Sequence, residues 1–67
     1  MTEPLTMELI LRRRAERDVD RAAALENVRH FYASRGEHRN ARHCLAQRDC
    51  ALLMAQVADA NAERYAA

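Results

Sequence analysis

The sequence predicts an all-α fold, a single long antiparallel helical hairpin that dimerises into a four-helix bundle. The 67 residues include 14 alanines and 7 leucines, which favour helix. A single Gly and a single Pro leave almost no material for turns, which excludes a many-stranded β fold. A chain of this length has room for one domain, residues 1–67, with one small core.

Residues that typically start and end helices predict two helices along the chain. Thr2, Glu3 and Pro4 suit the first turn of a helix, and nothing interrupts a helix until Gly36, which can adopt the left-handed conformation that ends one. We therefore expect the first helix at about residues 3–34, a turn at about 35–39 and the second helix at about 40–65.

Each expected helix carries one apolar stripe that would face the other. On the first helix the stripe is Leu11, Ala15, Asp18, Ala22, Leu25, Arg29 and Tyr32. On the second it is Ala41, Leu45, Arg48, Leu52, Ala55, Asp59, Ala62 and Ala66, flanked by Cys44, Ala51 and Ala58. The alanines predict a close approach of the helices. The charges of Asp18 and Arg48 stand too far apart to pair within the chain; either Arg48 reaches a second subunit, or both extend to water.

The second helix also carries a spare apolar row, which predicts a homodimer. The row contains Ala46, Cys50, Leu53, Val57 and Ala60, with Met54 beside it. A two-helix hairpin has no third layer to cover it, so two hairpins would pack these faces around a two-fold axis. We expect the dimer interface at Ala46, Cys50, Leu53, Met54 and Val57.

A second candidate surface lies at the start of the first helix, where apolar residues precede a run of arginines. Its residues are Leu5, Leu9, Ile10, Arg13, Arg14, Arg17 and Arg21. An apolar anchor beside an arginine rim is typical of protein interfaces. The alternatives are a solvated, salt-bridged face and a nucleic-acid face; the second is disfavoured because acids are interleaved and no aromatic residue lies among the arginines.

Catalysis, metal binding and cofactor binding are disfavoured. The histidines and the two cysteines lack the C-x2-C or H-x3-H spacing of a metal site, and a straight hairpin offers no enclosed pocket for an enzyme. The net charge of +1 excludes a polycationic nucleic-acid binder. No apolar run is long enough to span a membrane, and the first residues do not resemble a signal peptide; we therefore expect a cytoplasmic protein.

The turn region resembles one tetratricopeptide hairpin: Leu25-x2-Val28-Arg29-x2-Tyr32 and then Ala41-x3-Leu45 follow its pattern, with Arg29 in place of a small residue. This resemblance implies the hairpin alone, because a solenoid needs about three copies. In size, hairpin layout and expected dimerisation the chain also looks like the small phage-encoded anti-activators that bind quorum-sensing transcription regulators. That resemblance covers the architecture and carries over no residue.

The sequence thus predicts a small non-enzymatic module that binds another protein, such as a transcriptional regulator, and inhibits or modulates it. One alternative is a nucleic-acid-binding regulator that uses the arginine-rich face. The other is a structural subunit of a larger complex.

Overall fold

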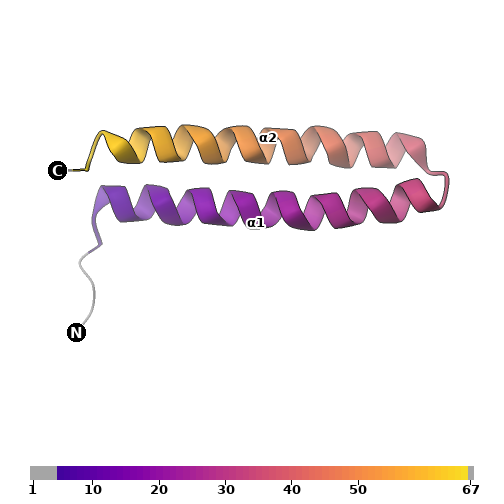
Figure 1. Cartoon of the computed structure of the whole chain (residues 1–67), viewed down its shortest axis with the longest axis horizontal. Helices are drawn as coiled ribbons and strands as arrows, with labels where there is room; N and C mark the ends of the chain where they lie inside the picture. Colours follow the sequence, from indigo (N-terminus) through magenta and orange to yellow (C-terminus); the bar gives the residue numbers. More distant parts are fainter. Residues whose placement is uncertain (1–4, 67) are drawn as a thin grey trace.

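The computed structural model describes residues 5–66, which form two antiparallel helices joined by a short turn (Figure 1). Helix α1 spans Met7–Ser34 and helix α2 spans His38–Glu63. At 1.5 Å per residue they are about 42 and 39 Å long, and they lie side by side over their whole length. The all-α hairpin is therefore confirmed, with the turn at one end and both helix termini at the other.

Helix α1 begins at Met7, four residues later than the sequence suggested. Thr6 has extended backbone angles, and its Oγ1 accepts a hydrogen bond of 3.1 Å from the backbone N–H of Leu9. This is the geometry of an N-cap, and it fixes the start of the helix after Thr6. The expected cap at residues 2–4 lies outside the described residues.

The turn is built around Gly36, as expected. Gly36 has φ +75°, in the left-handed region. Its N–H donates to the carbonyl of Ala33 at 3.1 Å, and the N–H of Glu37 donates to the carbonyl of Tyr32 at 3.0 Å. These two bonds form a Schellman motif, which satisfies carbonyls at the end of α1. Helix α2 then begins at His38, earlier than the expected residue 40.

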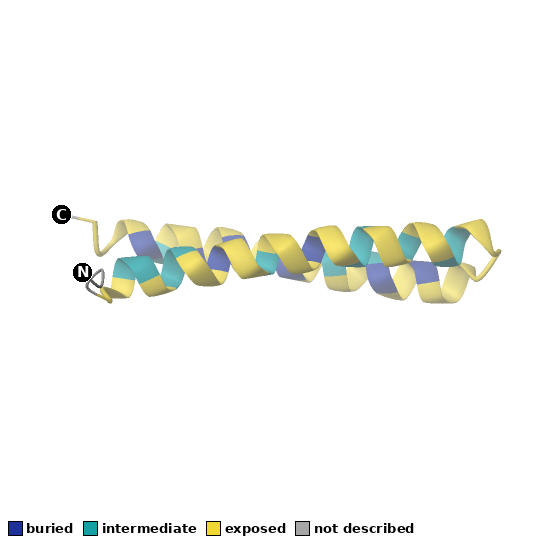
Figure 2. Cartoon of the chain, turned by 90° about the horizontal axis from the view of Figure 1, so that it is seen from below, coloured by how far each residue is buried: buried dark blue, intermediate teal, exposed yellow. Residues whose placement is uncertain are grey.

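Buried positions occur along both helices (Figure 2), and the residues at these positions have small side chains. The buried residues of the described chain are Ala15, Ala22, Ala41, Cys44, Ala51, Ala55, Ala58 and Ala62. No large hydrophobic side chain is among them, and Ala15, Ala55 and Ala58 form one buried cluster. Alanine on both sides lets two helix backbones approach closely, so the hairpin is held by a narrow seam.

The seam uses the predicted stripe of α1 but a shifted face of α2. All seven stripe residues of α1 are buried or half-buried. On α2, Leu52 and Asp59 are exposed although they were expected to face α1, whereas Ala51 and Ala58 are buried although they were expected at the flank. The smallest side chains occupy the closest contact line, because a leucine there would hold the helices apart.

Ion pairs bridge the two helices on either side of their midpoint. Arg48 Nη1 donates to Glu26 Oε2 at 2.6 Å, and Glu26 also accepts a bond of 3.0 Å from Arg29 Nε. Near the termini, Arg12 bonds Glu63 at 3.2 Å. The expectation that Arg48 pairs with a second subunit or extends to water is therefore corrected: its cross-helix partner is Glu26 of the same chain.

The Glu26 carboxylate is strongly stabilised in its charged form. Hydrogen bonds from Arg29 and then from Arg48 lower its pKa from 4.5 to about 2, against an opposing effect of desolvation. The hydrogen bond to Glu26 raises the pKa of Arg29, and hydrogen bonds to Asp49 and then to Glu26 raise the pKa of Arg48, so these guanidiniums remain charged. This cluster fixes the register of the two helices near the middle of α2.

Candidate protein-binding surfaces

A groove of about 530 Å³ lies at the start of α1, where the chain enters the helix. It is lined by Leu5, Ile10, Arg13, Arg14, Arg17 and Asp18, and we call it the N-terminal groove. Leu5 precedes the N-cap Thr6, and Ile10 is the fourth helical residue, the two positions that form a hydrophobic staple. The extended segment thus brings Leu5 to the same groove as Ile10, although both side chains remain substantially exposed.

Three arginines in and beside this groove are exposed to solvent. Arg14, Arg17 and Arg21 are exposed, and none of them pairs with an acid within the described residues. The salt-bridged alternative for this face therefore does not apply to these three side chains. Asp18, half-buried, is the acid that lines the groove.

The structure brings together five of the seven residues predicted for this surface. Leu9 is half-buried and lies outside the groove lining, and Arg21 is exposed one helical turn beyond Arg17. Sequence reasoning missed the contribution of Asp18, which it assigned to the seam. Its position one helical turn after Arg14 was the signal that could have placed it beside the arginines.

The outward face of α2 is a second candidate surface. The predicted dimer residues are all exposed: Ala46, Cys50, Leu53, Met54 and Val57. Leu53 leaves 58% of its area in solvent, Met54 49% and Val57 46%. Cys50 on this face is an exposed free thiol, whereas Cys44 is buried against α1. The apolar row is therefore continuous and uncovered within the hairpin.

The total surface also exceeds that of a globular monomer. The 67 residues expose 5368 Å², whereas a monomer of 7.7 kDa is expected to expose about 4,300 Å². The excess, which counts the whole chain, is about 1,000 Å² and is similar to the roughly 800 Å² that each partner buries in a standard interface. The elongated hairpin thus exposes enough area for one interface.

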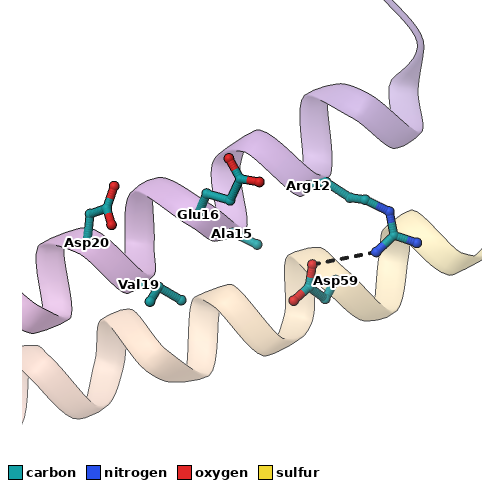
Figure 3. A pocket seen from close by; sticks show the side chains of 6 residues that line it. All are labelled: Arg12, Ala15, Glu16, Val19, Asp20 and Asp59. Carbon is teal, nitrogen blue, oxygen red and sulfur yellow. Dashed lines mark ion pairs between the residues drawn. The ribbon is translucent and has the colours of Figure 1, made fainter.

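A shallower groove between the helices does not have the features of a binding site. It measures about 370 Å³ and is lined by Arg12, Ala15, Glu16, Val19, Asp20 and Asp59 (Figure 3). Arg12 reaches across to Asp59, with 3.9 Å between Nη1 and Oδ1. Glu16 and Asp20 point away from α2 in this view. Four of the six lining residues are therefore charged, and two of these, Arg12 and Asp59, pair with each other across the helices.

The turn end of the hairpin carries aromatic and basic side chains. Phe31 is 53% exposed, and its ring meets the ring of Tyr32 edge-on at 5.7 Å. The Arg35 guanidinium lies 5.2 Å from the centre of the Phe31 ring, a cation–π contact. Further exposed basic residues here are His38, Arg39 and Arg42.

Within residues 5–66, no group of three or more His, Cys, Asp or Glu side chains is placed to hold a metal ion. Neither described helix is both long enough and apolar enough to cross a membrane. No family model, curated protein or solved structure matches the chain.

Proposed function

We propose that the chain is a small, non-enzymatic protein-binding module that acts as a homodimer and inhibits or modulates a second protein. One observation carries this proposal: the buried residues between the helices are alanines and Cys44, whereas large apolar side chains such as Leu53, Met54 and Val57 are exposed. A two-helix chain of this size gains little stability from such a seam. Covering the outer face of α2 with a second copy would supply the missing apolar burial.

The N-terminal groove is the surface we assign to the second protein. Leu5 and Ile10 offer an apolar anchor, and the exposed Arg14 and Arg17 offer a charged rim. Together these features suit a protein surface that combines an apolar side chain with acidic neighbours. Nucleic acid fits less well, because Asp18 lines the groove and none of the lining residues is aromatic.

A transcriptional regulator is the class of target that we propose, on the basis of the architectural resemblance to phage-encoded anti-activators. Binding of the module to such a regulator would block the surface it covers. The arginines would speed association with an acidic target, and this attraction would weaken as salt rises.

The groove is tested by reversing two of its charges. The tagged chain would first be used to capture its target from a bacterial lysate. The amount of the same target captured by the Arg14→Glu/Arg17→Glu variant would then be measured. Both side chains are exposed, so stability should change within about 0.5 kcal/mol, whereas reversed electrostatics should abolish binding. The matched control is Arg39→Glu/Arg64→Glu, which changes the net charge equally at exposed positions outside the groove.

The result distinguishes the N-terminal groove from the basic turn as the site that binds the target. Loss of the target in the groove variant with binding retained in the control supports the N-terminal groove. Full binding by the groove variant contradicts it and points to the basic turn, where Arg39 lies.

The dimer is tested by sedimentation equilibrium at micromolar concentration, where we expect about twice the monomer mass. Leu53→Asp/Val57→Asp should give a monomer of lower helicity, because it places two charges in the apolar face of α2. Ile10→Asp, at an exposed apolar residue of α1, is the control and should leave the dimer intact. A well-folded monomer of the unmodified chain would contradict the proposal.

A further inference from the structure

We infer that the two copies pair α2 against α2 in antiparallel orientation, with Cys50 opposite the partner's Leu53 and Arg42 beside the partner's Glu63. This inference rests on the proposed dimer and specifies its geometry. Three features of the outer face of α2 carry it: the spacing of its apolar row, the distribution of charge along the helix, and the sizes of the side chains in the row.

The spacing of the row is that of a coiled-coil seam. Along the exposed face the apolar residues follow at intervals of four, three, four and three: Ala46, Cys50, Leu53, Val57 and Ala60. This alternation keeps one face turned toward a second helix that crosses at a small angle. The row covers about 21 Å of the helix at 1.5 Å per residue. A second helix of the same kind is therefore the occupant that this face fits.

The charge distribution selects the antiparallel orientation. Residues 38–48 of α2 contain three arginines and no acid, whereas residues 49–66 contain three acids and one arginine. Residues 38–48 thus carry a formal charge of +3 and residues 49–66 one of −2, counted with Arg48, Asp59 and Glu63, which also pair within the hairpin. A parallel pair would place like charges together at both ends, but an antiparallel pair places each basic end beside an acidic end. The same orientation also aligns the two helix dipoles favourably.

The sizes of the side chains select the register. A coiled-coil seam uses two heptad positions, a and d. In an antiparallel pair, an a residue of one helix faces a d residue of the other. When Cys50 faces the partner's Leu53, Ala46 faces the partner's Val57. Each layer then combines one small and one large side chain, which fills space evenly across a two-fold axis. The axis passes between Ala51 and Leu52.

The same register brings complementary charges together at both ends of the seam. Arg42 and Glu63 occupy the flanking position on the same side of the row, so Arg42 lies beside the partner's Glu63 at each end. Both residues are exposed, and the Glu63 side chain is 71% exposed even while it bonds Arg12. Glu63 can therefore accept a second guanidinium without releasing the first.

Distance measurement distinguishes the two orientations. A spin label would be attached at Arg39→Cys in a Cys50→Ala background; Cys44, 7% exposed, is shielded from labelling. The antiparallel register separates the two labelled backbone positions by about 37 Å along the seam, whereas a parallel pair brings them to about 10 Å. Double electron–electron resonance should therefore show a distance of about 35–40 Å.

The alternatives give different results. A short distance of about 10–20 Å, including label length, would overturn the inferred orientation and leave the dimer standing. A monomer of the unmodified chain by sedimentation would overturn the inference and the proposed dimer together. Under the inference, no target protein occupies this face. If a target bound the outer face of α2 and lost binding only in the Leu53→Asp variant, the assignment of this face to a second copy would likewise be overturned.

A charge swap tests the register independently of labelling. Arg42→Glu and Glu63→Arg should each weaken dimerisation about 3- to 10-fold, because each variant turns two symmetric attractions into repulsions. Combining the two changes should restore the dissociation constant to within about twofold. Arg21→Glu on α1 is the control and should leave dimerisation unchanged. Failure of the combined variant to recover would overturn the register, with helicity measured alongside to confirm that each chain is folded.

Discussion

Replacing Ala55 with Leu tests whether the hairpin is held by an alanine seam. Ala55 is 4% exposed and packs in one cluster with Ala15 and Ala58. Leucine adds three carbon atoms where the two backbones approach closely, so the helices must separate or the side chain must leave its preferred rotamer. Overpacking of this kind costs about 1–3 kcal/mol. For a domain of 67 residues this lowers the melting temperature by about 5–20 °C.

The assay is thermal and urea unfolding followed by circular dichroism at 222 nm, at one fixed protein concentration because association contributes to stability. Ala24→Leu is the matched control, since Ala24 is exposed on α1 and the substitution adds the same atoms in a helix. Its free energy of unfolding should change by no more than about 0.5 kcal/mol. If Ala55→Leu were as stable as Ala24→Leu, the helices would not be in close contact at Ala55, and the seam described above would be wrong.

Two further predictions concern the Glu26 cluster and the turn. Because the pKa of Glu26 is lowered to about 2 in the folded chain, its ion pairs stabilise the hairpin fully above pH 4.5, and this contribution is lost as the pH falls toward 2. Glu26→Gln should therefore lower the free energy of unfolding at pH 7 and flatten its pH dependence between pH 4.5 and 2. An unchanged pH dependence in this range would refute the assignment. Gly36→Ala should lower stability by about 1–2 kcal/mol, because φ is +75° while an added Cβ meets no atom within 4 Å, so the cost is backbone strain alone; Gly36→Asn should recover part of it in urea unfolding.

The sequence was sufficient to predict the hairpin, the buried stripe of α1 and part of the contact face of α2, where Ala41, Ala55 and Ala62 are buried as expected but Leu52 and Asp59 are exposed. On α1 the stripe stands out because charged residues occupy most of the opposite face. On α2 apolar residues occur nearly all round, so periodicity alone cannot choose between neighbouring stripes. The choice is made by size: Ala51 and Ala58 allow close approach, and Leu52 is displaced to the edge.

The candidate groove could be predicted only in part, because it depends on where α1 begins. An expected helix start near residue 3 treats Leu5 as part of the helix. The N-cap at Thr6 instead leaves Leu5 before the helix, where it lines the same groove as Ile10. The Glu26–Arg48 pair was missed because Glu26 lies outside the apolar stripe of α1, and Asp18 was the acid weighed as a partner of Arg48.

In this hairpin the buried contact residues and the exposed candidate binding residues are different, so mutations can test folding and binding separately. The buried contact line is built from alanines and one cysteine. It sets the spacing and register of the helices but offers few chemical groups for recognising another molecule. Leu53, Ile10 and Arg14, which could recognise another molecule, contribute little to that line because they remain exposed. Substitutions in the N-terminal groove should therefore change association with little change in the helical hairpin. On the outer face of α2 the proposed second copy supplies burial that the alanine seam lacks, so Leu53→Asp should lower both the dimer mass and the helicity, whereas Arg14→Glu should lower neither. The contrast between these two variants shows which outer surface the fold depends on.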